Sequence, residues 1–246
     1  MKATGDLTEE DEDTMASRLD MDAAPTLPDD PAPPRRARIS PQERHKEFVR
    51  KAVELFSEVG FEAGTRELAQ RLGVTQPLLY RYFPSKDDLI AAVYREIYVD
   101  RWKPQWREGL LDESRPIRER ILAFYEDYTD TIFTPEWLRI YLFAGLRGVD
   151  INKRYTTTVE HEIIRPIALA TRKAFGLKDT EPVTAEELEL FWTLQGGIFY
   201  YGVREVVYGF KMPVDRQTMI RNSVDTFLEG VSSVLKRIAK KPERKR

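Results

Sequence analysis

The feature that most constrains the fold is a close succession of helix stops and starts in the first third of the chain. A short helix is predicted over residues 65–72, and Gly73 ends it because glycine best tolerates the left-handed backbone of a helix C-terminus. A second short helix, over residues 76–83, starts beside Pro77 and is broken by Pro84. Two short helices joined by a three-residue turn are typical of a helix-turn-helix motif.

Helical spacing divides the second of these helices into two faces. Leu79 and Phe83 are four residues apart, so both are predicted to face the core. The other side chains are more exposed, and together they are too apolar to serve solubility alone: they are Gln76, Pro77, Leu78, Tyr80 and Arg81. In a major groove, glutamine can pair with adenine, proline and leucine can contact thymine methyl groups, and tyrosine can reach a phosphate or a base. This face is therefore predicted to read DNA.

The rest of the ordered chain is also predicted to be helical. Residues 40–43 and 184–187 each form a capping box, in which a serine or threonine precedes a glutamate by three positions. Apolar residues repeat at helical spacing, and no alternating strand pattern of useful length occurs. Further helices are expected over residues 85–102, 115–132, from 134, about 150–175, 184–208 and 215–238, with a kink or break at Pro166. The predicted fold class is all-α.

Charge and composition divide the chain into segments. Residues 1–34 hold ten acidic residues against Lys2 and Arg18, a net charge of −8, so the remaining chain carries +6. The predicted segments are a disordered acidic and proline-rich arm (1–38), a helix-turn-helix DNA-binding domain (39–84), a second helical domain (85–240) and a basic tail (241–246). The chain has no cysteine and no run of about 18 apolar residues, which excludes disulfides and predicts a cytoplasmic protein without a membrane partner.

Residues 65–89, TRELAQRLGVTQPLLYRYFPSKDDL, resemble the DNA-binding motif of the TetR (tetracycline-repressor) family of bacterial transcription regulators. The matching positions are Thr65, Leu68, Ala69, Gly73, Val74, Thr75, Tyr80, Tyr82, Phe83, Lys86 and Leu89. The resemblance covers residues 43–95, and the all-helical remainder agrees only in architecture. Many members carry glycine where Pro77 stands, and Gln76-Pro77 resembles the variant in the tetracycline repressors themselves. That difference concerns which operator is bound.

The resemblance implies a role for each matching side chain. Thr65, Tyr82 and Lys86 are expected to hold phosphates. The residues expected at base edges or sugars are Arg66, Gln76, Pro77, Leu78 and Tyr80, and Thr75 and Arg81 complete the expected DNA-binding set. Two alternatives stay open at this point: Tyr82 as an edge residue of the core, and Arg81 as a solvated side chain.

One such unit reads only a few base pairs, so a homodimer on two half-sites is expected. The predicted interface consists of the helices over about 184–208 and 215–238. The resemblance implies that these two helices and their counterparts in the partner form a four-helix bundle across the dimer. Three glycines in the first of these helices, Gly196, Gly197 and Gly202, cost helix stability and predict either close approach of a partner helix or room for a ligand.

The resemblance also implies that residues 85–240 are a helical effector-binding and dimerisation domain, with a small-molecule effector pocket inside it. Aromatic side chains are plentiful there, which suits an apolar or aromatic effector. The expected effector-binding residues are Trp102, Trp106, Tyr125, Tyr128, Trp137, Tyr141 and His161, within a wider aromatic set that includes Phe124, Phe143 and Tyr155. No cofactor, metal site or catalytic residue is predicted.

Two other classes of protein remain as alternatives. A helical enzyme is one, although the sequence has no nucleophile elbow, phosphate-binding glycine loop or HExxH motif, and His45 and His161 lie in separate segments. A helical protein-interaction module without DNA binding is the other. The preferred hypothesis is a DNA-binding transcriptional regulator, more specifically a repressor that an effector releases from a palindromic operator.

Overall fold

The computed structural model describes residues 40–178 and 182–239, and every regular element in these two ranges is a helix. The all-α prediction is therefore confirmed for the described chain. The predicted arm (1–38) and basic tail (241–246) lie outside the described residues. The helices are α1 (Pro41–Val59), η1 (Gly60–Glu62), α2 (Thr65–Arg71), α3 (Gln76–Tyr82), α4 (Lys86–Tyr94), η2 (Arg95–Val99), α5 (Gln105–Leu111), α6 (Ile117–Ile132), α7 (Pro135–Arg147), α8 (Ile151–Val159), η3 (Glu160–Ile164), α9 (Arg165–Ala174), α10 (Ala185–Gly202), η4 (Val203–Val207) and α11 (Arg216–Ala239). Within the described ranges, no helix is long and apolar enough to cross a lipid bilayer.

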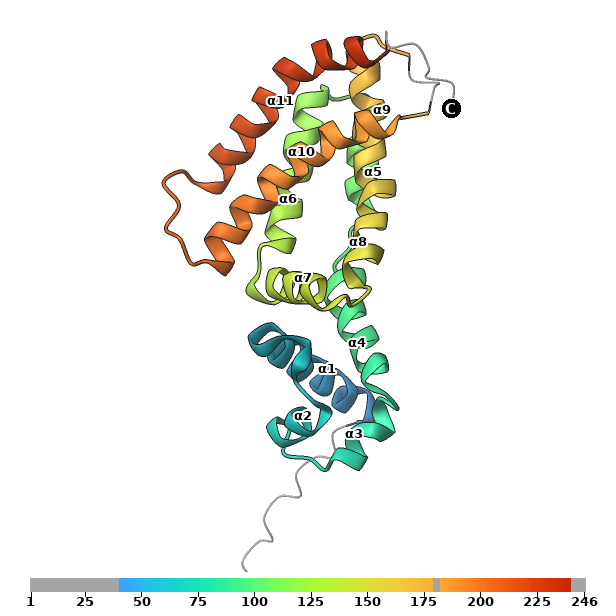
Figure 1. The fold of residues 1–246 in the computed structure, drawn as a ribbon. Coiled ribbons are helices and arrows are strands. Elements are labelled where there is room, and N and C mark those ends of the chain that lie inside the picture. The colour runs from blue at the N-terminus through green and yellow to red at the C-terminus, as the bar shows by residue number, and fades with distance from the viewer. Residues whose placement is uncertain (1–39, 179–181, 240–246) are drawn as a thin grey trace, which may run out of the picture. The chain divides into compact units, whose positions relative to one another are not determined.

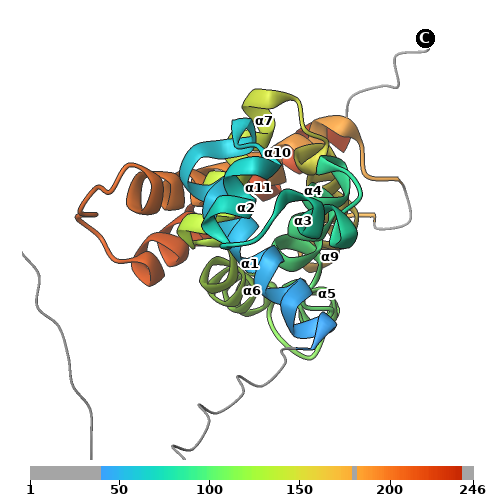
Figure 2. The ribbon, with the colours of Figure 1, turned by 90° about the horizontal axis from the view of Figure 1, so that it is seen from below.

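The N-terminal helices form the predicted helix-turn-helix. The Ser40 hydroxyl accepts a hydrogen bond from the Glu43 backbone N–H at 3.1 Å, which starts α1 as the capping box predicts. Gly73 has a φ of 64°, so it ends the α2 segment in the left-handed conformation that favours glycine. Leu79 and Phe83 are both buried, which confirms their predicted inward orientation. Helix α2 packs on both α1 and α3 (Figure 1, Figure 2).

Helix α7 joins these N-terminal helices to the rest of the chain. It packs along α1, and the Arg139 side chain donates to the backbone oxygens of Ser57 and Glu58 at 2.5 and 3.2 Å. Helix α1 also packs on α4, so the helices on the two sides of residue 84 are in contact. In the C-terminal part, α11 packs along both α10 and α6 (Figure 1).

Three of the helices contain a wider π-type turn that the sequence pattern did not predict. The expected helix over residues 150–175 is a continuous path of α8, η3 and α9, and the wide turn of η3 directly precedes the first turn of α9, where Pro166 lies. A proline ring clashes with the preceding turn of a regular α-helix, and the wider turn gives it room. The helices that begin at α4 and α10 widen in the same way, at η2 and η4.

Helix α5 was not predicted. It has only seven residues, follows Pro104, and contains Gly109, so its sequence carries no strong helix signal. It forms because its apolar residues Trp106 and Leu110 are buried, with the helix packed on α6 and α9. Tertiary packing therefore stabilises an element that local propensity does not favour.

A buried ion pair fixes the start of α10. The Glu187 carboxylate completes the capping box with Thr184 and also accepts from Arg172 of α9 at 2.9 Å. Both charged side chains are buried, and Arg172 donates further to the backbone oxygen of Pro182. Burial raises the pKa of Glu187, but hydrogen bonds from Arg172 and Thr184 outweigh it and hold that pKa below its ordinary value.

The structure explains Gly202 at the end of α10 by a close contact within the chain. An added Cβ at this position would lie 2.5 Å from the ring of Phe133, which is itself buried. We expect Gly202→Ala to lower the free energy of unfolding by about 1–3 kcal/mol, because the ring has no free space into which to move. Thermal and urea denaturation would measure the change.

The matched control is Gly109→Ala, since an added Cβ at Gly109 meets no atom within 4 Å. Its expected effect is a neutral or slightly higher stability, because alanine favours the helix over glycine. Equal stability losses in the two variants would contradict the role assigned to the Gly202–Phe133 contact.

Candidate DNA-reading surface and ligand cavity

The first candidate site is the outer surface of α2 and α3, which we call the reading face and define as Thr65, Arg66, Thr75, Gln76, Pro77, Leu78, Tyr80 and Arg81. Five of these side chains are exposed: Arg66, Thr75, Pro77, Tyr80 and Arg81. The other three are half-buried. Tyr80 leaves 41% of its surface exposed, which is unusual for a large aromatic residue. The face thus combines two guanidinium groups with apolar surface, which is the composition that a DNA groove requires.

A hydrogen-bonded chain across the motif holds the polar part of the reading face in place. The Gln76 Nε2 donates to Thr65 Oγ1 at 3.0 Å, and the Thr65 Oγ1 and Tyr80 hydroxyl lie 3.2 Å apart. Thr65 therefore links the first residue of α2 to two residues of α3. Gln76 retains one N–H donor and its carbonyl acceptor for a ligand, and these match the N7 acceptor and N6 donor of adenine. No local sequence pattern predicts this link, because the residues are 11 and 15 positions apart.

The remaining two expected DNA contacts, Tyr82 and Lys86, also make contacts within the chain. The half-buried Tyr82 ring packs edge-on against Phe48, with the ring centroids 5.0 Å apart. The Lys86 ammonium donates to the backbone oxygen of Phe61, and so ties the start of α4 to η1. A phosphate contact from Lys86 requires that its ammonium be shared with, or released from, this carbonyl.

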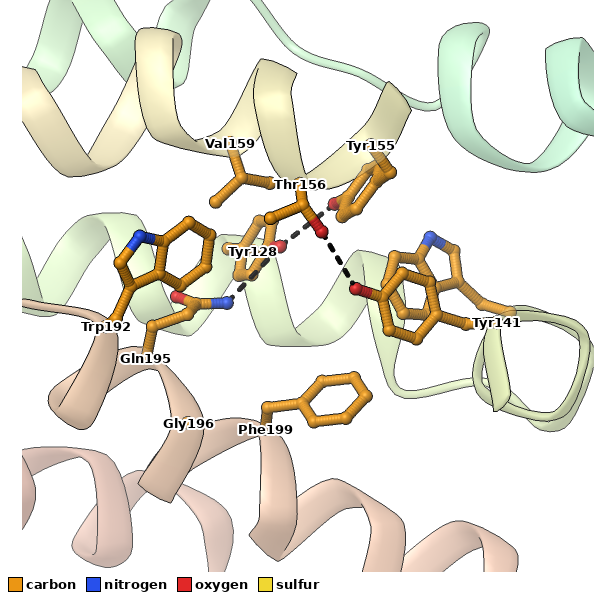
Figure 3. Close-up of a pocket in the computed structure, with 10 residues that line it drawn as sticks. Tyr128, Tyr141, Tyr155, Thr156, Val159, Trp192, Gln195, Gly196 and Phe199 are labelled. Carbon is orange, nitrogen blue, oxygen red and sulfur yellow. Dashed lines mark hydrogen bonds between the residues drawn. The ribbon is translucent and has the colours of Figure 1, made fainter. Parts of the chain in front are cut away.

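The second candidate site is a cavity of about 120 Å³ between α6, α7, α8 and α10 (Figure 3). It is lined by Tyr128, Trp137, Tyr141, Tyr155, Thr156, Val159, Trp192, Gln195, Gly196 and Phe199. Most of these side chains are apolar or aromatic, which is typical of a small-molecule site.

Hydrogen bonds pair the phenols that line the cavity. The Tyr128 and Tyr155 hydroxyls are 2.9 Å apart, and the Tyr141 hydroxyl lies 3.2 Å from Thr156 Oγ1 (Figure 3). Burial raises the pKa of both Tyr128 and Tyr155 well above its ordinary value, so both phenols are neutral at physiological pH. The wall of the cavity therefore presents no charge from these groups.

Gln195 supplies a polar group that the described protein leaves without a partner. Its Nε2 lies 3.4 Å from the Tyr128 hydroxyl, to which it donates, whereas its Oε1 is buried and accepts no hydrogen bond from the described residues. A buried acceptor without a partner costs free energy. A ligand that donates a hydrogen bond to Oε1 removes that cost.

The cavity includes only part of the residue set predicted for the effector. Tyr128, Trp137 and Tyr141 line it, whereas Trp102, Trp106, Tyr125 and His161 do not. Trp102 and Trp106 pack against each other, with the ring centroids 5.2 Å apart, and Trp106 Nε1 donates to Asp127.

Tyr125 and His161 lie away from the cavity for opposite reasons. Tyr125 is wholly buried, and its side chain does not reach the lining. His161 is exposed and does not line this cavity, so its expected contact with an effector stays a prediction. A composition of aromatic residues could not distinguish these positions, since the distinction depends on which side of each helix faces the cavity.

Helix α10 contributes four lining residues that were not predicted: Trp192, Gln195, Gly196 and Phe199. The sequence did contain one signal for them, because the glycines of α10 predicted room for a ligand. Gly196 lies at the cavity, and Gly197 lies in a groove with residues of α11. An added Cβ at either glycine would meet no described atom within 4 Å. The two glycines therefore leave open space on two sides of the same helix.

The segment that contains the reading face matches known regulatory proteins. Residues 48–93 match the family model described as bacterial regulatory proteins, tetR family. The tetracycline repressor protein class A from transposon 1721 of Escherichia coli is 39% identical over 84 residues, which cover 31% of this chain and 39% of that protein. The HTH-type transcriptional activator FasR of Mycolicibacterium smegmatis is 33% identical over 93 residues, which cover 36% of this chain and 42% of that protein. The matches span about two fifths of the length of these relatives.

Solved structures of TetR-family proteins resemble the whole fold. A TetR-like transcriptional regulator from Rhodococcus sp. RHA1 matches with a TM-score of 0.56 at 17% identity, covering 83% of this chain and 100% of that one. AmtR of Mycobacterium smegmatis matches with a TM-score of 0.53 at 22% identity, covering 85% and 100%. At such low identity the likeness establishes the fold alone, and the match to the tetR family model is confined to residues 48–93.

The unpartnered oxygen of Gln195 leads to a prediction on stability. We expect Gln195→Leu to leave the free energy of unfolding unchanged or to raise it by about 1 kcal/mol, because it removes a buried acceptor without a partner. Thermal denaturation would measure it. A loss of more than about 2 kcal/mol would show that the Gln195 oxygen is satisfied in the folded protein.

The matched variant is Tyr155→Phe, which removes the partner of the Tyr128 hydroxyl. Here the free energy of unfolding should fall by about 1–2 kcal/mol, since a well-formed buried hydrogen bond is lost. The pair of variants thus compares a satisfied polar group with an unsatisfied one in the same cavity.

Proposed function

We propose that this TetR-family chain acts in the cytoplasm as a homodimeric transcriptional repressor, which binds a palindromic DNA operator and is released from it when a small molecule occupies the aromatic cavity. The observation that carries the DNA-binding part is the reading face, which lies within the segment that matches the tetR family model and is held by Thr65. The division into a DNA-binding domain (39–84) and an effector-binding and dimerisation domain (85–240) is part of the same proposal. An enzyme or a protein-interaction module is less well supported, because the matching relatives and structures are regulators.

On DNA, the N-terminal half of α3 enters the major groove. Gln76, held by Thr65, pairs with a base, while Pro77 and Leu78 contact thymine methyl groups. Arg66 and Arg81 are exposed and supply positive charge beside the groove. In the dimer, two such heads bind half-sites about one helical turn apart.

The dimer forms through α10 and α11. A groove between these helices is lined by Thr193, Leu194, Gly197, Asn222, Ser223, Thr226 and Phe227. Its side chains are small or apolar, apart from one asparagine, and Gly197 leaves room for close approach of a partner helix. Such a surface supports burial against a second copy better than contact with water.

The effector is a small neutral molecule with an aromatic or apolar body and a hydrogen-bond donor. The aromatic walls support the apolar body, and the neutral phenols argue against recognition of a charge. The buried Gln195 oxygen supports the donor, because it is a polar atom of the cavity lining that has no hydrogen-bond partner among the described residues.

A direct contact supports communication between the cavity and α4. Tyr98, in the wide turn that extends α4, donates from its hydroxyl to the Trp137 backbone oxygen at 3.0 Å. Its ring also packs against the rings of Trp137 and Tyr155, at centroid distances of 5.0 and 5.3 Å. A ligand that displaces these two cavity residues therefore moves the helix that leads to the reading head, and shifts the population away from the DNA-binding spacing.

The reading face is tested by Gln76→Ala in a duplex-binding assay on the DNA that flanks the gene. We expect the operator Kd to rise by about 5- to 150-fold, because one base contact contributes roughly 1–3 kcal/mol. Thr65→Val should weaken binding in the same direction, since Gln76 and Tyr80 lose their common partner. Fluorescence anisotropy at fixed salt would measure both values.

The control for that test is Lys173→Ala, which removes an exposed positive charge from the C-terminal end of α9, outside the reading face. Its operator affinity should equal that of the unmodified protein. If Gln76→Ala and Thr65→Val bind the operator as tightly as the control, the proposed DNA-reading surface is wrong.

The effector cavity is tested by Gly196→Leu, which fills the open space beside α10. We expect this variant to keep its operator affinity. Small aromatic alcohols or amines that release the unmodified protein from the operator should no longer release this variant. A screen of such compounds against the protein–operator complex provides the effector for the comparison. Gly109→Ala, in α5, is the matched glycine control and should respond normally. If the Gly196→Leu protein releases the operator at the same effector concentration as the unmodified protein, this cavity is not the effector site.

A further inference from the structure

A second pocket, of about 210 Å³, lies between α5 and α6. It is lined by Gln105, Trp106, Gly109, Arg115, Arg120, Ala123, Phe124 and Asp127. None of these residues lines the aromatic cavity, so the pocket is a separate space. Unlike the cavity, it contains charged groups.

The most unusual group in this pocket is Arg120. It is only 7% exposed, yet it forms no ion pair with any described residue. Its Nη1 donates to the Leu110 backbone oxygen at 3.1 Å, while its Nε is buried and has no partner. The nearby Asp112 carboxylate accepts hydrogen bonds from Ser114, at 2.6 Å from the hydroxyl and 3.1 Å from the backbone N–H. These hydrogen bonds, and to a smaller extent the positive charge of Arg120, hold the pKa of Asp112 below its ordinary value, but Asp112 forms no hydrogen bond or ion pair with Arg120 among the contacts of the described residues. A buried guanidinium with unfilled donors costs free energy unless an anion meets it.

The other charged groups of the pocket are either engaged or of the same sign. Asp127 accepts from Lys103 at 2.7 Å and from Trp106 Nε1 at 2.6 Å. The Lys103 hydrogen bond holds the pKa of Asp127 below its ordinary value, so this carboxylate stays ionised and paired. Arg115 adds a second guanidinium, and its contact with Glu119 is long, at 3.8 Å, and exposed. Among the charged groups that line the pocket, Arg120 is therefore the one that is buried and retains a donor without a partner among the described residues.

Gly109 provides an independent indication that the space is kept open. It lies inside the short helix α5, where glycine lowers helix stability, and no packing contact requires it because an added Cβ meets no atom within 4 Å. Trp106, Ala123 and Phe124 give the pocket apolar surface, and the rings of the two aromatic residues lie 6.1 Å apart and nearly perpendicular.

We propose that this pocket binds a small organic carboxylate. The carboxylate accepts two hydrogen bonds from the Nε and Nη2 edge of Arg120, which is the paired-donor geometry that guanidinium groups provide. The apolar body of the ligand packs against Trp106, Ala123 and Phe124. A cavity of about 150 Å³ holds benzene, so this volume suits a ligand of the size of benzoate.

A ligand in this pocket would contact side chains that also pack against the aromatic cavity. The ring of Trp106 packs against Tyr128 at a centroid distance of 5.2 Å, and Phe124 stacks on Tyr128 at 5.0 Å. Tyr128 in turn lines the cavity. A carboxylate that orders Trp106 and Phe124 therefore also restrains Tyr128 in the cavity lining. Binding of the carboxylate does not depend on the function proposed above.

Isothermal titration calorimetry of the full chain with sodium benzoate tests the proposal, with benzamide as the neutral ligand of the same shape. We expect benzoate to bind, and benzamide to bind about tenfold more weakly or worse, because charge-assisted hydrogen bonds to Arg120 are lost. Gly109→Leu should abolish benzoate binding by filling the pocket, and a leucine at this helical position should not impair folding. Gly196→Leu, in the separate cavity, should bind benzoate with unchanged affinity.

Three results would overturn the proposal: no benzoate binding to the unmodified protein, equal binding of benzoate and benzamide, or equal binding to the Gly109→Leu and unmodified proteins. The last result would place the ligand elsewhere. Arg120→Met adds a direct test if the variant remains folded by circular dichroism, and its benzoate affinity should fall by about tenfold or more. If it unfolds, Gly109→Leu and the benzamide comparison still decide the question.

Discussion

The packing of Trp137 is the constraint on which the rest of the structure depends. This residue of α7 is 2% exposed, and its ring contacts those of Tyr98, Tyr141, Tyr155 and Phe199. Four different helical segments therefore meet at one side chain, and the same helix α7 also packs along α1. Aromatic pairs with this geometry stabilise beyond their buried area. The shape of the cavity and the packing of α7 against α1 consequently depend on one cluster.

Some buried polar groups of the described residues are fully hydrogen-bonded, and others retain an atom without a partner. Arg172 and Glu187 satisfy each other and the start of α10, which is expected for a pair with a structural role. Gln195 and Arg120 each retain a buried atom without a partner, and each lines a separate open space. Folding stability alone does not favour such atoms, since an apolar side chain of similar size removes the cost. Ligand binding provides a physical reason for them.

Much of the N-terminal half of the fold could be predicted because its signals are local. Capping boxes, Gly73 and the spacing of Leu79 and Phe83 each act within a few residues, and the structure agrees with all of them. The wide helical turns and α5 could not be predicted, because they respond to neighbours that are distant in sequence. The same limit applies to the effector residues, where aromatic composition indicated a site but His161 lies outside it.

The sequence by itself determined the all-α class, the helix-turn-helix and the two faces of α3, because helix periodicity, caps and breakers are properties of neighbouring residues. Only the tertiary structure decided that Thr65 holds Gln76 and Tyr80, and that α10 completes the aromatic cavity with Gln195. Tertiary structure likewise decided that Arg120 is buried, with no ion-pair partner among the described residues, in a pocket that Gly109 also lines. These arrangements join residues that are far apart in the chain or depend on how whole helices pack. Their geometry therefore depends on the orientation of each helix about its axis, which local sequence does not specify.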